Sequence, residues 1–159
     1  MTQPIIGETA PAFTLPRDGG EGQTVSLSDF SNQYLVLYFY PRDDTPGCTT
    51  EANEFTAHKA EFDALNASIV GISRDTVQKH DKFIAKHDLD VILGADTEGT
   101  VTEDYGVWGE KKNYGKTYMG IQRATFLISP KGEIVHTWPK VRVKGHVAAV
   151  LETLRDHAA

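Results

Sequence analysis

The hydrophobic residues of the chain change their spacing at residue 35, where the most informative stretch begins. Residues 35–40, Leu-Val-Leu-Tyr-Phe-Tyr, form an unbroken apolar run that stops at Pro41. Such a run is typical of a strand that is buried on both faces of a sheet. Residues 41–47 then hold two prolines, two aspartates and one glycine. That composition cannot continue a strand ladder, so it predicts a loop.

A helical spacing begins at Cys48. Ala52, Phe55, Phe62 and Leu65 recur near the helical period, with charged residues between them. We therefore expect one amphipathic helix that runs from the end of the loop to Leu65. Cys48 then lies in the first turn of a helix that follows a buried strand. Unpaired amide groups and the positive end of the helix dipole at that position favour a thiolate.

The rest of the chain alternates between strand and helix signals. We expect strands near 12–15, 24–27, 67–73, 91–93, 124–129 and 134–138, and helices near 28–33, 76–87, 100–105 and 145–157. Ser28 and Asp75 stand where the N-caps of two of these helices belong.

Residues 106–120 carry no clear period. They mix four glycines and three lysines with Trp108, Tyr114 and Tyr118. We expect a long surface loop there, of the kind that is often functional or mobile. Its aromatic residues are compatible with the rim of a pocket, with a protein contact or with packing beneath the loop.

This order of elements predicts an α/β fold. After an N-terminal β-hairpin, strands and helices alternate, and a second hairpin and a helix close the chain. Alternation favours parallel strands, whereas the Ser-Pro-Lys-Gly-Glu turn at 129–133 joins antiparallel ones. We therefore predict a three-layer sandwich with a mixed central sheet, formed by residues 1–159 as a single domain.

Composition narrows the function classes. The formal charge of −6 argues against sequence-independent nucleic-acid binding, which needs clustered Lys and Arg. No run has the length of a transmembrane helix, and the start Met-Thr-Gln-Pro-Ile-Ile lacks the layout of a signal peptide. We expect no membrane association and a cytoplasmic, reducing compartment.

The metal-ligating residues do not predict a metal site. Cys48 is the only cysteine, which excludes an internal disulfide and a cysteine-rich zinc site. The six histidines, at 58, 80, 87, 136, 146 and 157, show none of the spacings of metal-binding helices. We expect most of them to be solvated.

The stretch around Cys48 resembles a known active-site signature. Pro41, Thr45 and Cys48 form Pro-x-x-x-Thr-x-x-Cys, which is similar to the signature of the peroxiredoxins. The longer string Phe-Tyr-Pro-Arg-Asp-Asp-Thr-Pro-Gly-Cys-Thr-Thr-Glu resembles the bacterioferritin-comigratory, or Q-type, subfamily. The resemblance covers nearly the whole chain. It implies a thioredoxin-like fold and a thiol-dependent peroxidase that reduces hydrogen peroxide and alkyl hydroperoxides.

The resemblance also implies which residues carry the reaction. Cys48 is the nucleophile that attacks the peroxide, and Arg123, in Gly-Ile-Gln-Arg-Ala-Thr, matches the arginine that lies beside the sulfur. The backbone amides of Gly47 and Cys48, the hydroxyl of Thr45 and the guanidinium of Arg123 hold the peroxide oxygens. No metal, haem, flavin or selenium cofactor is implied.

Two further residues receive supporting roles. By the same resemblance, Pro41 shelters the sulfur from water and fixes the loop. Glu51 lies one turn after Cys48, so it is placed to brace Arg123 through an ion pair, although its charge would weaken the pull of the arginine on the thiolate.

The chain departs from much of the subfamily at the second cysteine. Many members place a resolving cysteine five positions after the first, and others place it on the next helix. The matching positions here are Asn53 and about Ile84. We therefore expect an external thiol, such as glutathione, a glutaredoxin or a thioredoxin, to reduce the sulfenic acid on Cys48. We expect a monomer in preference to a dimer, because members of the Q-type subfamily are often monomers.

Two other functions remain open at this stage. The missing resolving cysteine is compatible with a peroxide sensor or chaperone that forms mixed disulfides without efficient turnover. A cysteine hydrolase or transferase would need a histidine within hydrogen-bond reach of the sulfur. His58 lies on the same expected helix, but roughly 15 Å along its axis from Cys48, too far to serve as that base.

Overall fold

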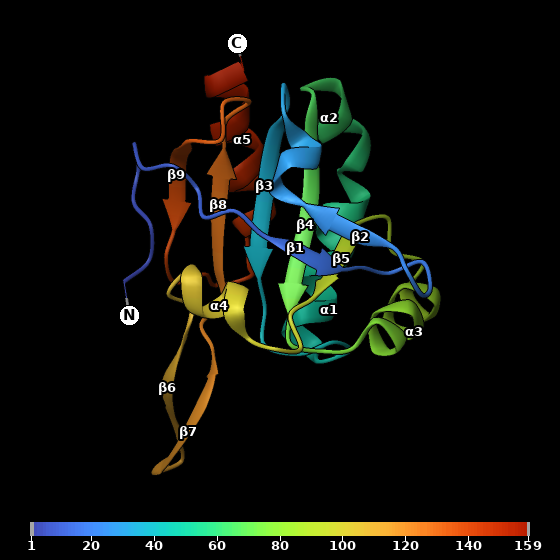
Figure 1. Cartoon of the computed structure of the whole chain (residues 1–159), viewed down its shortest axis with the longest axis vertical. Helices are drawn as coiled ribbons and strands as arrows, with labels where there is room; N and C mark the ends of the chain where they lie inside the picture. The colour runs from blue at the N-terminus through green and yellow to red at the C-terminus, as the bar shows by residue number, and fades with distance from the viewer. Residues whose placement is uncertain (1, 159) are drawn as a thin grey trace.

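The structure of the protein, a computed structural model, describes residues 2–158. Its elements are, in chain order, β1 (Thr14–Pro16), β2 (Thr24–Ser26), the 3-10 helix η1 (Leu27–Phe30), β3 (Tyr34–Phe39), α1 (Pro46–Ala57), α2 (Lys59–Ala64), β4 (Ala67–Ser73), α3 (Val77–His87), β5 (Ile92–Ala95), α4 (Thr100–Asp104), β6 (Trp108–Asn113), β7 (Lys116–Ile121), β8 (Ala124–Ile128), β9 (Ile134–Trp138) and α5 (His146–Ala158). Figure 1 shows most of them arranged about one central sheet.

The central sheet has five strands in the order β5-β4-β3-β8-β9. β3 pairs with β4 in parallel, and β4 pairs with β5 in parallel. β8 runs antiparallel to β3 on its other side, and β9 runs antiparallel to β8. The predicted mixed sheet is confirmed, and the predicted buried strand, β3, is its middle strand.

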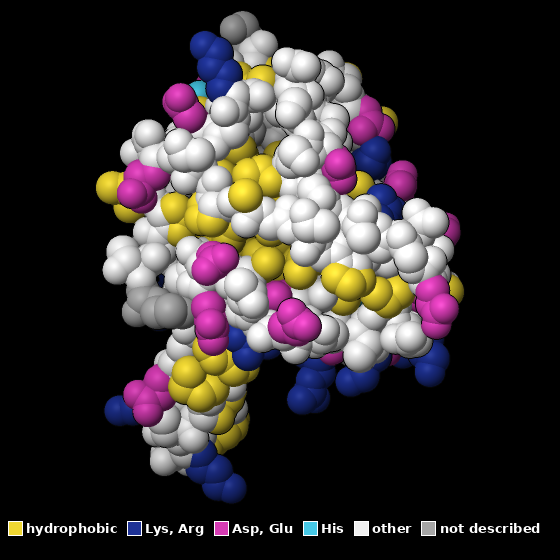
Figure 2. Space-filling model, viewed as in Figure 1, with side chains coloured by type: hydrophobic (Ala, Val, Ile, Leu, Met, Phe, Trp, Pro, Cys, Tyr) yellow, Lys and Arg dark blue, Asp and Glu magenta, His cyan; other side chains and the backbone are white. Residues whose placement is uncertain are grey.

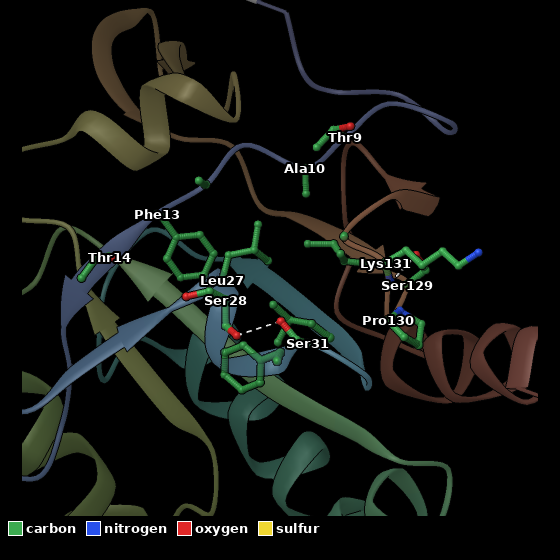
Figure 3. A pocket seen from close by; sticks show the side chains of 15 residues that line it. Thr9, Ala10, Phe13, Thr14, Leu27, Ser28, Ser31, Ser129, Pro130 and Lys131 are labelled. Carbon is green, nitrogen blue, oxygen red and sulfur yellow. Dashed lines mark hydrogen bonds between the residues drawn. The ribbon is translucent and has the colours of Figure 1, made fainter.

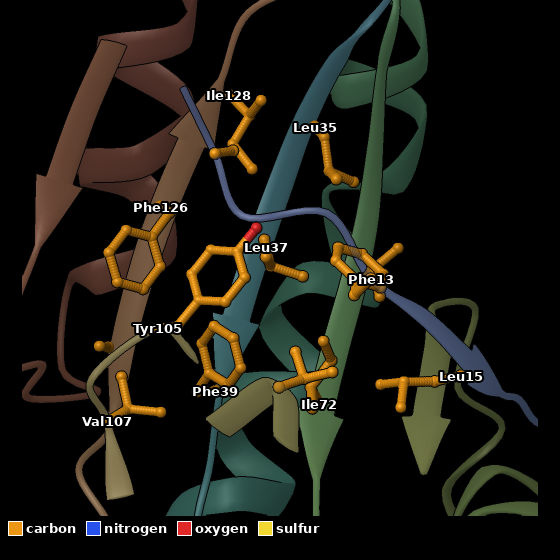
Figure 4. Packing of buried hydrophobic residues seen from close by; sticks show 14 of the residues in the cluster. Phe13, Leu15, Leu35, Leu37, Phe39, Ile72, Tyr105, Val107, Phe126 and Ile128 are labelled. Atoms are coloured by element: carbon orange, nitrogen blue, oxygen red, sulfur yellow. The ribbon is translucent and has the colours of Figure 1, made fainter. Parts of the chain in front are cut away.

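The two faces of the sheet are covered by different layers. Alternate residues of β3 point to opposite faces, so that Leu37 and Phe39 pack with Tyr105 and Phe126, in the cluster that Figure 4 shows. The opposite face packs against α1, α2, α3 and α5. Because each fully buried side chain of this size contributes about 1.5–3 kcal/mol, β3, which leads into the loop 41–47, is firmly held.

The N-terminal hairpin crosses the first face. β1 and β2 pair antiparallel with Leu15 opposite Val25, and both side chains are buried in the same cluster as Leu37. Figure 1 shows the hairpin and α4 in front of the sheet, while α1, α2 and α5 lie behind it. The predicted three-layer arrangement with an N-terminal hairpin is therefore confirmed.

The helix expected to run from the loop to Leu65 is in fact two helices. α1 ends at Ala57, and His58 has φ −100° and ψ 9°, outside the helical range, before α2 begins. The turn at His58 redirects the chain so that the rings of Phe55 and Phe62 lie 5.9 Å apart. Both phenylalanines are buried, as the periodic pattern predicted, although they belong to different helices.

Two helix starts differ from the sequence prediction. η1 is capped by Ser26 instead of Ser28. α3 is capped by Thr76, whose Oγ1 accepts the backbone amide of Lys79 at 3.2 Å, instead of by Asp75. The carboxylate of Asp75 is used elsewhere, in a buried network described below.

The C-terminal helix follows its prediction closely. Val147, Val150, Leu151 and Leu154 are all buried against the sheet. Among residues 2–158, no helix has both the length and the apolar character that crossing a bilayer requires.

The segment expected to be a surface loop, residues 106–120, is mostly a β-hairpin. β6 and β7 pair antiparallel from Trp108 opposite Ile121 to Asn113 opposite Lys116. The connection needs positive φ at both central residues, which are Tyr114 at 51° and Gly115 at 77°. The hairpin projects away from the body (Figure 1). Both of its faces are largely exposed, so it has none of the apolar alternation that usually reveals a strand.

Candidate active site

Cys48 is the third residue of α1. The helix begins at Pro46, where a missing amide hydrogen costs nothing and a fixed φ suits the first turn. Thr45 precedes it in an extended conformation, and the first intrahelical bond runs from the amide of Thr49 to the carbonyl of Thr45, at 2.8 Å. The amides of Gly47 and Cys48 therefore belong to the unpaired first turn, as predicted for a helix N-terminus.

Arg123 lies directly beside the sulfur. It comes from the short connection between β7 and β8, and its Nη2 donates to Sγ of Cys48 at 3.4 Å. Its Nη1 donates to Oε1 of Glu51 at 2.7 Å. A planar guanidinium can serve both partners at once because its donors point in different directions. The structure thus brings together three residues that the sequence singled out.

Glu51 is a buried carboxyl. Its side chain has no exposed surface, and burial raises its pKa to about 7 although Arg123 acts in the opposite direction. Its second oxygen, Oε2, has no hydrogen-bond partner among the described residues. Burial and the guanidinium therefore act in opposite directions on the charge of Glu51.

Gly47 lets the loop approach the arginine. A Cβ at this position would lie 3.1 Å from Nη2 of Arg123, closer than most real Cβ contacts, and 3.9 Å from a methyl group of Val143. A larger residue would push the guanidinium away from Cys48. This is a physical reason for glycine at a position where the backbone must come close to a charged group.

Thr45 and Pro41 are less directly placed. The hydroxyl of Thr45 donates to the carbonyl of Arg42 at 2.9 Å, a bond that closes the loop. Pro41 is exposed directly after β3. Within residues 2–158 no hydrogen bond joins either side chain to the sulfur, so their roles toward a peroxide stay predictions.

The sulfur itself is almost covered. Cys48 is 1% exposed and lies among the apolar residues of the helical face, including Phe55. Within residues 2–158, its hydrogen-bond partner is Arg123 and no histidine contacts it. A cysteine hydrolase, which needs such a histidine, is not supported by this geometry.

Comparison with known proteins places the chain in a family. The AhpC/TSA family matches residues 6–137, a range that includes the loop, Cys48 and Arg123. The chain belongs to this family. Its relatives include Peroxiredoxin Bcp of Bacillus subtilis, 51% identical over 151 residues and covering 95% of each chain. Peroxiredoxin Bcp of Xanthomonas campestris is 44% identical over 158 residues, 99% of each chain.

Solved structures of the AhpC/TSA family match the fold. A cysteine-to-serine mutant of PrxQ from Xylella fastidiosa has a TM-score of 0.92 at 39% identity and covers 100% of this chain and 99% of that one. The bacterioferritin comigratory protein of Xanthomonas campestris, studied for its alkyl peroxide reduction activity, has a TM-score of 0.86 at 44% identity, with 92% of each chain covered. The resemblance to Bcp and Q-type peroxiredoxins and the thioredoxin-like fold are confirmed.

This member of the family has one cysteine. The positions that the resemblance assigns to a resolving cysteine hold Asn53, which is exposed on α1, and Ile84, which is half-buried on α3. Cys48 is therefore the only thiol that the chain offers.

Two neighbours of the site were missed in the sequence. The hydroxyl of Tyr38 is buried without a partner in the described chain, and its ring fills the space over Gly71 on β4. Burial, followed by the charges of Glu51 and Cys48, raises the pKa of Tyr38 well above its usual value. Lys111 donates to the carbonyl of Ile121 at 3.0 Å, and burial and then Arg123 lower its pKa. The sequence did not single out Tyr38, because it lies in the apolar run 35–40, or Lys111, because it lies in a segment expected to be a surface loop.

Two of the six histidines, His80 and His146, are buried, and the other four are exposed or half-buried, as expected for most of them. His146 is bonded through Nε2 to Oγ1 of Thr125 at 2.8 Å, and burial, followed by Arg123, lowers its pKa to about 4. His80 has no exposed side-chain surface. Its polar partners explain why it tolerates burial, and they are described below.

A cavity of about 630 Å³ lies away from the sulfur. It is lined by the segment that includes Thr9 and Phe13, by η1, and by the β8–β9 turn around Pro130 (Figure 3). None of its lining residues belongs to the loop 41–47. The candidate active site is therefore identified by its charged contacts and not by the size of a cavity.

Proposed function

We propose that the protein is a thiol-dependent peroxidase that reduces hydrogen peroxide and alkyl hydroperoxides. The observation that carries the proposal is the contact between Nη2 of Arg123 and Sγ of Cys48, 3.4 Å, at the N-terminus of α1. A cation and unpaired amides beside a thiol favour the thiolate, the form that attacks peroxides. The activity studied in the Xanthomonas campestris relative supports the same substrate class.

The oxidation step balances as a displacement. The sulfur of Cys48 attacks one peroxide oxygen, so an S–O bond forms as the O–O bond breaks. The electron pair leaves with the other oxygen, which takes up a proton and departs as water or an alcohol. The sulfur becomes a sulfenic acid. Arg123 and the amides of Gly47 and Cys48 are the donors aimed at the developing negative charge.

The reduction step uses thiols from outside the chain. A first external thiol attacks the sulfenic sulfur, releases water and leaves a mixed disulfide with Cys48. A second external thiol then attacks the mixed disulfide. This step restores the thiol of Cys48 and releases a disulfide between the two external thiols. Glutathione, a glutaredoxin or a thioredoxin are the candidate reductants, because no second cysteine is present.

The proposed site needs only one copy of the chain. Cys48, Arg123 and Glu51 all come from the same chain and are joined by contacts at 3.4 and 2.7 Å. We accordingly expect residues 1–159 to act as a single catalytic domain and as a monomer, and size-exclusion chromatography with light scattering tests the monomer.

The decisive experiment compares wild type with Cys48→Ser. Wild-type protein with hydrogen peroxide and dithiothreitol should consume peroxide catalytically, and the serine variant should not. Peroxide alone should add one oxygen atom to the mass of Cys48, and glutathione should then convert the adduct to a mixed disulfide. Peroxide consumption by the serine variant would overturn the assignment. Rapid oxidation of Cys48 followed by very slow turnover with every thiol tested would favour a peroxide sensor instead.

A further inference from the structure

A buried polar network lies beside the catalytic loop and is not used by the reaction described above. Its centre is Asp43, the buried residue of the loop 41–47, whose other residues are exposed or half-buried. One carboxylate oxygen accepts the hydroxyl of Tyr40 at 2.5 Å. The other lies 2.6 Å from Nδ1 of His80, a residue of α3.

The network joins four parts of the fold. The backbone amide of Asp43 donates to Oδ2 of Asp75, in the connection between β4 and α3, at 2.8 Å. Ser73 donates its hydroxyl to the same oxygen at 2.7 Å. On the far side of the imidazole, Nε2 of His80 donates to the carbonyl of Gly94 on β5 at 2.9 Å. The loop is therefore tied to the residue that follows β3, to the β4–α3 connection, to α3 and, through the ring, to β5.

The hydrogen bonds determine where the protons are. The carbonyl of Gly94 can only accept, so Nε2 of His80 carries a hydrogen. The contact between Nδ1 and Asp43 then holds one more proton, and the pair as a whole is neutral. Tyr40 remains a donor, since burial and the neighbouring Asp43 raise its pKa well above its usual value. A buried hydrogen bond between two such polar groups is costly to break from one side only, because the remaining partner is left unsatisfied.

The network acts on the residues that meet the substrate. Asp43 lies five positions before Cys48, and the loop between them presents the amides of Gly47 and Cys48. The intervening residue Asp44 has a φ of 60°, in the left-handed region that non-glycine residues rarely adopt. An anchor next to a strained residue is needed to keep such a loop in one conformation.

We propose that Asp43 and His80 are a positioning pair, which holds the catalytic loop in the geometry that attacks a peroxide. The inference rests on the proposed peroxidase function and adds residues to it. Neither side chain touches the sulfur. Loss of their contact should misplace the amides of Gly47 and Cys48 relative to Arg123, and such misplacement slows reactions steeply.

The pair should affect the two halves of the cycle differently. Attack on peroxide needs the loop in its anchored conformation. Reduction needs a bulkier external thiol to reach a sulfur that is 1% exposed, so the groups around the sulfur must move, and a loosely anchored loop makes that movement easier. A variant with a weaker anchor should therefore be slow in oxidation and at least as fast as wild type in reduction. A variant that is merely destabilised would be slow in both.

Two substitutions of His80 separate its two contacts. The amide nitrogen of Asn occupies about the place of Nδ1, so His80→Asn retains a donor to Asp43 and loses the bond to Gly94. Gln reaches the place of Nε2, so His80→Gln retains the bond to Gly94 and loses the donor to Asp43. Asp44→Asn is the matched control, because Asp44 is on the same loop and bonds α3 through Lys86 and His87 on the exposed surface.

The experiment measures each half-reaction on the full chain. Reduced protein is mixed rapidly with hydrogen peroxide and quenched, and the oxidised fraction is read by intact mass. Oxidised protein is then mixed with glutathione in the same way. We expect His80→Gln and Asp43→Asn to slow oxidation by about ten- to a hundredfold and not to slow reduction. His80→Asn should recover most of the oxidation rate, and Asp44→Asn should match wild type.

The outcomes distinguish the inference from the function on which it rests. Equal slowing of both half-reactions by His80→Gln, or full oxidation rates in every His80 and Asp43 variant, would overturn the positioning pair while leaving Cys48 as the nucleophile. Peroxide consumption by Cys48→Ser would overturn the function itself. Should Asp43→Asn fail to fold, the two His80 variants still decide the question, with thermal unfolding as the check on their stability.

Discussion

Two segments that are far apart in the sequence lie next to the site of Cys48, and they are held in different ways. The loop between β3 and α1 is fixed by buried contacts of Asp43 to Tyr40, Asp75 and His80. The β6–β7 hairpin is fixed by its own backbone ladder, and much of it is exposed (Figure 2). The loop should therefore be sensitive to substitution at its buried anchor, Asp43, and more tolerant at exposed positions such as Asp44.

The hairpin is anchored to the body at its base, next to Arg123. At its base, the amide of Gln122 donates to the carbonyl of Val107 at 2.7 Å, and the carbonyl of Arg123 accepts the amide of Val141 at 2.9 Å. At its tip, Tyr114 is 96% exposed. Sensitivity to substitution should therefore fall from the base to the tip. The comparison shows that the sensitivity of a position to substitution depends more on whether it is held by buried contacts than on how near it lies to Cys48 in the sequence.

The largest effect is expected at the base of the hairpin. Arg123→Ala should slow the oxidation of Cys48 by about a hundred- to a thousandfold, because it removes a donor aimed at the developing charge. Arg123→Lys should restore little, since a single ammonium cannot meet both the sulfur and Glu51 as the guanidinium does. Rapid mixing with hydrogen peroxide measures both, and Arg155→Ala, an exposed arginine of α5, is the control.

Stability must be separated from chemistry in that experiment. Arg123→Ala also leaves Glu51 buried without its cation, which should lower the free energy of unfolding more above pH 7, where the carboxyl is charged, than below it. The double variant Arg123→Ala with Glu51→Gln removes the stranded carboxyl, so it should regain stability without regaining activity. A double variant with wild-type oxidation rates would show that the guanidinium is dispensable.

The second effect concerns the pH dependence of stability. The folded pKa of Glu51 is raised to about 7 by burial, so the folded chain binds a proton that the unfolded chain has lost. The stabilisation that this proton gives the folded chain is fully present below the pKa of Glu51 in the unfolded chain. It is lost as the pH rises through about 7, the pKa of Glu51 in the folded chain. Between pH 5 and pH 8, wild type should lose roughly 2–3 kcal/mol more unfolding free energy than Glu51→Gln.

Urea unfolding at several pH values measures that difference. Glu152→Gln, on the exposed side of α5, should follow wild type. Parallel stability curves for wild type and Glu51→Gln would contradict the raised pKa of the buried carboxyl.

The long, regular elements of the fold could be predicted because their patterns are continuous. β4 was predicted with its observed bounds because it is a nearly continuous buried run, and α5 within one residue at each end because its buried apolar residues keep a helical spacing. The break at His58 could not be seen, because the apolar residues on both sides of it keep a helical spacing. The β6–β7 hairpin was missed because exposure on both faces removes the alternation of apolar residues.

The candidate site was predictable only in part. The place of Cys48 in a helix first turn followed from local pattern, but the approach of Arg123 across 75 positions came only from the family resemblance. Asp43 and His80 were not foreseen, since in a sequence a buried polar residue looks like a solvated one. Asp75 was assigned to a helix cap for the same reason: the local signal was present, but the carboxylate has buried partners.

The third effect tests how closely the loop packs on the arginine. Gly47→Ala would place a Cβ 3.1 Å from Nη2 of Arg123, so we expect oxidation to slow by about tenfold. Stability should not fall, since alanine is the better helix former by about 1 kcal/mol. Gly109→Ala in β6 is the control, because a Cβ there has no neighbour within 4 Å. An unchanged oxidation rate in Gly47→Ala, measured by rapid mixing, would show that the guanidinium tolerates displacement.

The smallest effect is expected at the tip of the hairpin. Tyr114 has a φ of 51°, a conformation that asparagine adopts more readily than tyrosine, and it is followed by Gly115. Tyr114→Asn creates the Asn-Gly pair that two-residue hairpin turns favour, so the free energy of unfolding should rise by about 0.5 kcal/mol or less. Because the tip is remote from the anchored base, both half-reactions should keep their wild-type rates. A changed rate of reduction by a protein thiol, with glutathione unaffected, would show that the exposed hairpin contacts the reductant and that its outer part is functional after all.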